Sequence, residues 1–347
     1  MDSRRRCNQG ETAVKAKATV PMRIDLAGGT LDVYPLYLFE GGGLTVNAAI
    51  STRACASIET REDSRLLITS KDLGLGEEIP SLDQMEFGGR LDLVKRALHY
   101  YRPETGLNVV VRSQAPAGSG LGASSALLMA LSHCLNKITE RGLSPEEIID
   151  VGANIEAQAI GIPTGKQDYF PPTYGGVCSI WFDVDGWRFE SLSEGNRLID
   201  LLNERLIVSY TSIPRLSSVT NWAMLKRYIE REGDTVARMH EIKTIALAMR
   251  DCLADSDLTT LSCLLDAEWQ LRKGLADGVT TPEIDAMMAA ARDAGALASK
   301  ICGAGGGGCM ITIAEPGGVS AVRKALSAAG AQVMPAHIVA GGLVLEE

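Results

Sequence analysis

Residues 116–126 read PAGSGLGASSA, a stretch with three glycines at alternate positions and a pair of serines. The leucines that follow recur at helical spacing and predict a helix over residues 124–138. Main-chain N–H groups of a glycine-rich loop at the start of a helix form a concave anion site, which the helix dipole strengthens. The alternative is a tight loop that only lets a strand and a helix pack closely. Because glycine spacing, serines and helix start coincide, the stretch favours phosphate binding, although it is not a Walker A loop.

The composition is that of an ordinary globular protein. A chain of 347 residues, 46% apolar and 22% charged, is long enough for two domains. The net charge of −9 argues against nucleic acid or an anionic membrane as partner, and there is no run of about 18 apolar residues that would predict a membrane span. The eight cysteines lack a C-x-x-C pair and the four histidines are isolated. We therefore expect a cytoplasmic protein without structural zinc.

The predicted elements change in character near residue 195. Residues 1–16 are expected to form a poorly ordered tail, residues 17–195 an N-terminal domain and residues 196–347 a C-terminal domain. Alternating and β-branched patterns predict the strands 17–25, 43–59, 65–70, 107–113, 176–184, 206–210, 331–340 and 342–347, and helical patterns dominate residues 217–298 and 319–329.

One helix carries both of its boundary signals. Ser144, Pro145 and Glu147 form the pattern of a capping box, and Gly161 supplies a C-terminal stop. The segment that follows, PTGKQDYFPPTYGG (163–176), is rich in glycine and proline and is predicted to be a loop.

A second glycine run lies at residues 303–308 and satisfies the spacing G-x-G-x-x-G. A dinucleotide-binding loop must open a helix, but the residues after this run, CMITIAE, predict a strand. We therefore disfavour a dinucleotide site. The run could still bring bare main chain, at Gly305 and Gly306, close to a nucleotide or its substrate.

Two carboxylates are candidates for chemistry. Glu156 shares its helix face with Ile149, Gly152 and Ile160, and burial on an apolar stripe would require a metal ion or a basic partner. The alternative is that Glu156 reaches solvent at the edge of the stripe. Asp168 lies in the glycine- and proline-rich loop and is a candidate general base, although aspartates in loops are commonly turn formers.

Charged residues also flank the first glycine-rich loop, where the sequence AGGTLD follows the first predicted strand. Arg23 could place a guanidinium on a transferring phosphoryl group, and Asp32 could accept hydrogen bonds from a polyhydroxy substrate. Each could equally belong to a surface salt bridge.

Together these segments resemble the GHMP kinases, the superfamily of galactokinase, homoserine kinase, mevalonate kinase and phosphomevalonate kinase. The three family motifs occur in order as VPMRIDLAGGTLD (20–32), PAGSGLGASSA (116–126) and KICGAGGGGCMI (300–311). The resemblance covers nearly the whole chain. It implies an α+β fold of two domains, an N-terminal βα domain with the phosphate loop and a ferredoxin-like C-terminal domain, with ATP between them.

The resemblance also implies roles for individual residues. Asp168 would be the catalytic base and Arg23 its basic partner, while Ser125 and Glu156 would hold Mg²⁺. An acceptor substrate would meet Gly29, Thr30, Asp32, Lys166, Gln167, Gly305 and Gly306. The ATP phosphates would be lined by Pro116, Gly118, Ser119, Gly120, Leu121, Gly122, Ala123, Ser124 and Ser125.

The acceptor is less well defined than the nucleotide. The first motif lacks the Glu-His of galactokinases, and GKQDYFPPTYGG (165–176) is similar to the corresponding loop of the D-glycero-D-manno-heptose 7-phosphate kinases, with Tyr169 in place of a glutamine. We expect an ATP-dependent kinase acting on the hydroxyl, at the anomeric position, of a sugar or sugar phosphate. The alternatives are another sugar such as fucose, glucuronate or galactose, a mevalonate-like alcohol, or an ATP-binding sensor without turnover. Arg53, Lys166 and Arg215 are candidate partners for a substrate phosphate.

Overall fold

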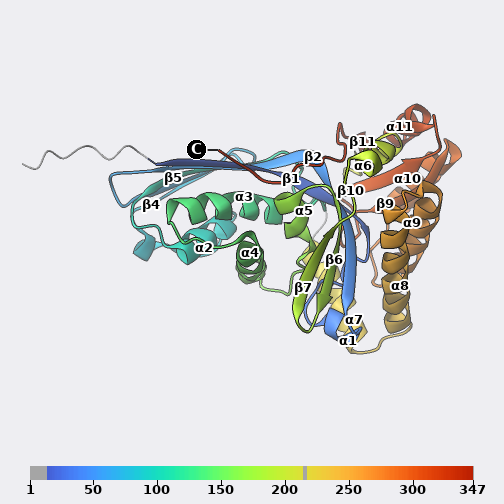
Figure 1. The fold of residues 1–347 in the computed structure, drawn as a ribbon, viewed down its shortest axis with the longest axis horizontal. Coiled ribbons are helices and arrows are strands. Elements are labelled where there is room, and N and C mark those ends of the chain that lie inside the picture. The colour runs from blue at the N-terminus through green and yellow to red at the C-terminus, as the bar shows by residue number, and fades with distance from the viewer. Residues whose placement is uncertain (1–13, 214–216, 347) are drawn as a thin grey trace, which may run out of the picture.

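The computed structural model describes residues 14–213 and 217–346. Its strands form two separate sheets, an eight-stranded and a four-stranded one, each covered by helices (Figure 1), which confirms the predicted α+β class. In the larger sheet the strands run in the order β12-β1-β2-β5-β3-β4, and β2 also pairs with β6, which pairs with β7. Their bounds are β1 Lys15–Ala27, β2 Gly43–Thr60, β3 Leu66–Ser70, β4 Leu75–Ile79, β5 Leu107–Ser113, β6 Val177–Asp183, β7 Gly186–Ser191 and β12 Val344–Glu346.

Helices from the N-terminal half cover one face of this sheet (Figure 1). They are α2 Asp92–Tyr101, α3 Ala123–Ile138 and α4 Pro145–Ile160. The predicted capping box of α4 is confirmed, because Glu147 N–H donates to the Ser144 hydroxyl at 3.2 Å and Ser144 N–H donates to the Glu147 carboxylate at 2.8 Å. Gly161, with φ +73°, ends the helix in the left-handed region as expected.

The smaller sheet has the order β11-β8-β10-β9 and carries the C-terminal helices. Its strands are β8 Leu206–Tyr210, β9 Ala296–Ile301, β10 Cys309–Ala314 and β11 Gln332–Val333. The helices of this half are α6 Arg197–Asn203, α7 Ser217–Ile229, α8 Thr235–Ala254, α9 Leu258–Lys273, α10 Pro282–Asp293 and α11 Val319–Ala328. A domain border near residue 195 stays a prediction: residues 186–191 and 206–210 belong to different sheets, but β12 returns to β1.

Three local predictions differ from the structure. The strand β1 begins at Lys15, so the predicted tail is wrong for residues 15–16, while residues 1–13 lie outside the described residues. Within the predicted loop 163–176, Gln167–Tyr169 form a 3-10 turn and Phe170–Tyr174 form helix α5. Two prolines lie in the first turn of α5, where a missing N–H costs no helical hydrogen bond. Of the predicted strand 331–340, only Gln332–Val333 form a strand, β11.

Candidate active site

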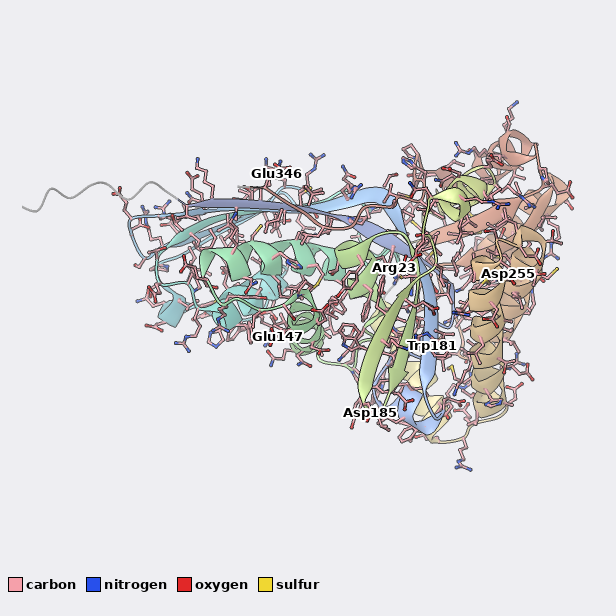
Figure 2. All side chains as sticks on the ribbon, viewed as in Figure 1. Arg23, Glu147, Trp181, Asp185, Asp255 and Glu346 are labelled. Carbon is pink, nitrogen blue, oxygen red and sulfur yellow. The ribbon has the colours of Figure 1, made fainter. Side chains whose placement is uncertain are left out.

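A cavity of about 790 Å³ opens between the phosphate-loop side of the larger sheet and the C-terminal half. Its described lining comes from segments that are far apart in the sequence: residues 29–33, 115–124 and 162–168, each in part, and the pair Gly303–Ala304. Arg23 is one of the lining residues and lies where β1 approaches the C-terminal half (Figure 2). The lining also includes residues in or next to β3, β5 and α2, among them Ser70, Asp72, Arg90 and Ser113.

The loop that precedes α3 has the main-chain geometry of an anion cradle. Gly118, Gly120 and Gly122 have φ angles of +70°, +74° and +67°, so every second residue lies in the left-handed region. Such an alternation directs consecutive N–H groups toward one point, and only glycine adopts it without strain. Gly122 is the N-cap of α3 and provides no side-chain cap for the first turn. The helix of 16 residues thus presents uncapped amides at its positive end.

The second glycine run holds this loop in place from the other half of the chain. Cys309 N–H donates to the carbonyl of Ser119 at 2.6 Å. A Cβ on Gly308 would lie 2.6 Å from that same carbonyl oxygen, and one on Gly307 would lie 2.4 Å from the carbonyl oxygen of Ile213. A side chain at Gly307 or Gly308 would therefore collide with main-chain atoms, which explains physically why these positions are glycine.

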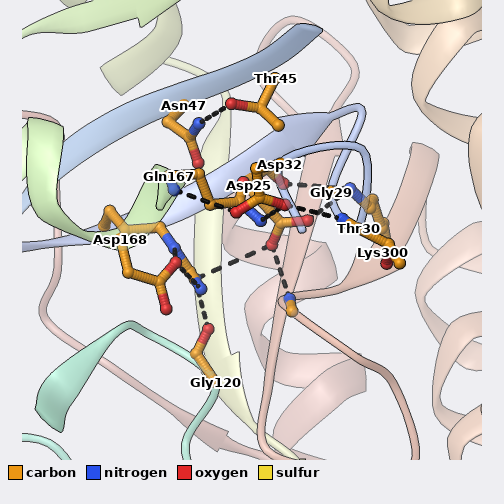
Figure 3. Close-up of polar contacts among 12 residues, drawn as sticks. Asp25, Gly29, Thr30, Asp32, Thr45, Asn47, Gly120, Gln167, Asp168 and Lys300 are labelled. Carbon is orange, nitrogen blue, oxygen red and sulfur yellow. Dashed lines mark hydrogen bonds and ion pairs between the residues drawn. The ribbon is translucent and has the colours of Figure 1, made fainter. Parts of the chain in front are cut away.

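Arg23 and Asp168 form an ion pair in the cavity. The Arg23 guanidinium contacts the Asp168 carboxylate through Nε at 2.7 Å and through a second nitrogen at 2.6 Å, and it donates to the carbonyl of Gly120 at 2.5 Å (Figure 3). Burial alone would lower the pKa of Arg23, but the charges of Asp168 and Asp25 outweigh it and raise that pKa. The Asp168 side chain keeps 26% of its surface exposed, so it can meet a substrate.

Glu156 is buried next to Ser124 and Ser125 of the phosphate loop, so the alternative that it reaches solvent at the edge of the apolar stripe is wrong. Its carboxylate accepts hydrogen bonds from the hydroxyls of Ser124, Ser125 and Tyr169, the one from Ser125 being 2.7 Å long. Burial raises the pKa of Glu156, and these three hydrogen bonds partly oppose that rise. Hydroxyl groups thus supply the compensation that the apolar stripe requires. Tyr169 had no assigned role in the sequence, because its approach to Glu156 depends on the turn at 167–169.

The loop after β1 is held by Asp32. Its carboxylate accepts the N–H of Thr30 at 3.1 Å and the N–H of Gln167 at 3.0 Å, and it lies so close to Gly165 that any side chain there would overlap it (Figure 3). Burial raises the pKa of Asp32 to about 6, although the hydrogen bond from Gln167 lowers it. Thr30, Asp32 and Gln167 all line the cavity.

The structure brings most of the predicted site residues to one cavity. Leu121 and Ser125 lie behind its wall, where the Leu121 carbonyl accepts the N–H of Arg23 at 3.1 Å. The other predicted phosphate-loop residues line it, namely Pro116, Gly118, Ser119, Gly120, Gly122, Ala123 and Ser124, as do Gly29 and Glu156.

Other predicted residues lie elsewhere. Lys166 is directed to Asp150, with 2.6 Å between Nζ and the carboxylate, because that partner is in the adjacent α4. Gly305 and Gly306 pack against residues 278–279, so their close approaches are to the α9–α10 connection and not to the cavity. Arg53 is not among the cavity-lining residues, and Arg215 lies outside the described residues.

The cavity also contains residues that sequence reasoning missed. Gly303 and Ala304 reach it in place of Gly305 and Gly306, and Asn221 reaches it from α7. A polar residue on an otherwise ordinary helix gives no sequence signal of such a position. Within the described residues, no three Asp, Glu, His or Cys side chains gather as a metal cage. The described helices also include none long and apolar enough to cross a membrane.

Two family models match the chain. The model described as GHMP kinases N terminal domain matches residues 92–176, and the model described as GHMP kinases C terminal matches residues 249–332. The first contains the phosphate loop, Glu156 and Asp168, and the second contains the glycine run at 303–308. The phosphate loop and the glycine run, which approach one another in the structure, therefore each fall within a region that a family model matches.

Individual relatives cover nearly the whole chain. The chain is 27% identical over 306 residues to the D-glycero-alpha-D-manno-heptose 7-phosphate kinase of Campylobacter jejuni, covering 86% of this chain and 89% of the relative. It is 30% identical over 316 residues to the mevalonate kinase of Methanothermobacter thermautotrophicus, covering 90% and 95%. The solved D-glycero-D-manno-heptose 1-phosphate kinase from Bacteroides thetaiotaomicron superposes with a TM-score of 0.77 at 26% identity, covering 96% of this chain and 99% of that one.

Proposed function

Since the chain belongs to the GHMP kinases, which are ATP-dependent phosphotransferases acting on alcohol groups, we propose that it phosphorylates a hydroxyl of a sugar or sugar phosphate. The observation that carries this proposal is the convergence of Asp168 and Arg23 with the phosphate loop in one cavity. A general base, a cation for the transferring group and a cradle of amides are the components that phosphoryl transfer requires. We also propose a cytoplasmic location, because the eight cysteines are scattered without a C-x-x-C pair.

In the proposed reaction Asp168 holds the acceptor hydroxyl and receives its proton. Arg23 orients the Asp168 carboxylate, and its guanidinium lies beside Gly120 of the phosphate loop, where charge develops on the transferring group. The amides of the phosphate loop and of the first turn of α3 bind the β- and γ-phosphates. Catalysis of this kind depends on position and electrostatics more than on covalent chemistry.

The residues at the foot of the phosphate loop fit a Mg²⁺ ion. Mg²⁺ prefers oxygen ligands and is commonly bound by one or two carboxylates together with substrate phosphates. Glu156 supplies a buried carboxylate, and Ser124 and Ser125 supply hydroxyls that contact this carboxylate. We propose Ser125 and Glu156 as the residues that hold the ion, which would neutralise charge on the β- and γ-phosphates.

The polar residues that line the cavity favour a polyhydroxy acceptor. Thr30, Asp32 and Asn221 bring a hydroxyl, a carboxylate and an amide to the cavity that Asp168 also lines. The heptose 7-phosphate kinase among the relatives supports a heptose 7-phosphate-type acceptor as the first candidate. The mevalonate kinase that is 30% identical supports a mevalonate-like alcohol as the second. Among the described cavity-lining residues the basic ones are Arg23 and Arg90, so a phosphorylated acceptor would draw on few cations.

The test combines an acceptor panel with Asp168→Asn. Heptose 7-phosphate, fucose, glucuronate, galactose and mevalonate are each incubated with ATP and Mg²⁺, and ADP release is measured. Asp168→Asn should lower kcat by about 10²–10⁴-fold and leave ATP affinity unchanged, because a general base acts on the acceptor.

Asp63→Asn is the matched control, since Asp63 is also paired with arginines, Arg61 and Arg65, but lies outside the cavity. Its kcat should equal that of the wild type. Retained ATP binding without turnover of any acceptor would refute the kinase proposal and favour a sensor. A loss smaller than about tenfold in Asp168→Asn would remove Asp168 from the role of base.

A further inference from the structure

Thr30 has a main-chain conformation that needs support. Its φ angle is +80°, in the left-handed region, which β-branched residues very rarely adopt. Residues held in such conformations persist where their surroundings fix them, and they concentrate at functional sites. Thr30 is 5% exposed and lines the cavity beside Asp32. The question is which groups fix it.

One answer is a buried arginine from α9. Arg272 donates to the carbonyl of Gly29 at 2.7 Å and to the hydroxyl of Thr30 at 3.4 Å. Its guanidinium is fully buried and bonds Glu268, one helical turn earlier, at 2.6 Å and 3.1 Å. The charged end of Arg272 is thus directed at the main chain of residues 28–33, the loop after β1 that we name the acceptor loop, and Arg272 itself does not line the cavity.

The same ion pair continues to the second glycine run. Lys300, near the end of β9, lies 3.0 Å from the Glu268 carboxylate. It also lies 2.8 Å from the carboxylate of Asp25 (Figure 3). Asp25 in turn accepts the N–H of Gly303 at 2.6 Å. Asp25, Lys300, Glu268 and Arg272 all have fully buried side chains. Two carboxylates and two cations therefore form one neutral, solvent-free chain of charges, which we name the buried relay.

The relay joins the acceptor loop to the glycine run of the C-terminal half. Its ends are Thr30 with Gly29 on one side and Gly303 on the other, and both Gly29 and Gly303 line the cavity. Removing one member of a buried ion pair leaves an uncompensated charge, whereas removing two opposite charges together preserves neutrality. Charges buried this deeply do not contribute to solubility, and what they contact is the main chain of residues that line the cavity.

We propose that the buried relay positions Thr30 for the acceptor, with Glu268 and Arg272 as positioning residues that set acceptor affinity and not nucleotide affinity. The part that concerns the acceptor rests on the proposed kinase function. The part that concerns the loop does not, because the conformation of residues 28–33 can be measured without any substrate.

The experiment uses the neutral double variant Glu268→Gln/Arg272→Met of the full chain. The matched control is Asp234→Asn/Arg238→Met, which removes a partly exposed aspartate–arginine pair of the same i, i+4 spacing at the start of α8, where Asp234 is the N-cap. Amide hydrogen exchange is measured over residues 28–33 and over residues 118–125, and KM and kcat are measured for the acceptor and for ATP. Thermal unfolding confirms that each variant is folded.

In the double variant we expect faster exchange over residues 28–33, unchanged exchange over residues 118–125, and an acceptor KM raised about tenfold or more at unchanged ATP affinity. Arg272→Lys, which keeps the charge and one donor, should recover part of the acceptor affinity. Unchanged exchange over residues 28–33 would overturn the relay whatever the substrate. Absence of turnover in the wild type would refute the proposed function alone, and the exchange data would still decide the relay.

Discussion

Gly308 is the position at which an added methyl group should do most damage to nucleotide binding. Its φ angle is +82°, and a Cβ there would lie 2.6 Å from the carbonyl oxygen of Ser119 and 2.8 Å from that of Gly118. Both atoms belong to the main chain, so the phosphate loop itself must move. Ordinary contact begins at 3.4 Å, so the displacement from 2.6 Å is about 0.8 Å. Misplacement by about 1 Å can cost on the order of 100-fold in activity.

The control for Gly308→Ala is Gly317→Ala. Gly317 has φ +76°, and nothing lies within 4 Å of the position that an added methyl group would take, so alanine there carries the same left-handed strain, about 1–2 kcal/mol, without a contact. We expect Gly317→Ala to lower the midpoint of thermal unfolding and to leave ATP affinity unchanged. Gly308→Ala should lower it further, weaken ATP binding about tenfold or more in calorimetry, and reduce kcat/KM about 100-fold. Equal ATP affinities of the two variants would refute the close approach.

Two further predictions concern groups around the cavity. Tyr169→Phe removes one hydrogen bond from Glu156, so the Mg²⁺ concentration for half-maximal activity should rise about tenfold, whereas Tyr174→Phe, which loses a surface bond to Glu146, should not change it. Burial raises the pKa of Asp32 to about 6, so the carboxylate loses its charge as the pH falls below 6, and the acceptor KM should rise there. Asp32→Asn should have a higher acceptor KM that does not change between pH 5 and pH 7, and a pH dependence equal to that of the wild type would exclude Asp32 as the cause.

The sequence was informative where local rules decide the structure. The glycines at 118, 120 and 122 indicated an anion cradle because their alternate left-handed conformations are a local property of the chain. The capping box of α4 likewise depends on residues three positions apart. The helix α5 at 170–174 was missed because proline and glycine usually mark loops, and its prolines are tolerated only by virtue of their place in the first turn.

The parts of the site that were missed depend on long-range packing. Arg272 contacts Gly29 across a separation of 243 residues. Its spacing from Leu261 and Leu265 places it on the buried face of α9, but the sequence does not indicate which distant group it meets there. Gly305 and Gly306 were expected at the substrate because all glycines of the run look alike in sequence. The structure gives each of them a different neighbour, and Gly303 and Ala304 are the ones that reach the cavity.

The end of β1 contacts both the residues proposed for phosphoryl transfer and the buried relay that holds the acceptor loop. Arg23 and Asp25 are two residues apart on one strand, so their side chains leave it on the same face, and both are buried. Arg23 holds Asp168 and Gly120, while Asp25 holds Lys300 and Gly303. Because the two side chains also approach one another to 3.9 Å, a shift of this strand would move both the proposed base Asp168 and the proposed acceptor loop. An acceptor that orders residues 28–32 would therefore stabilise the same strand that positions Arg23, which couples acceptor binding to the geometry of phosphoryl transfer.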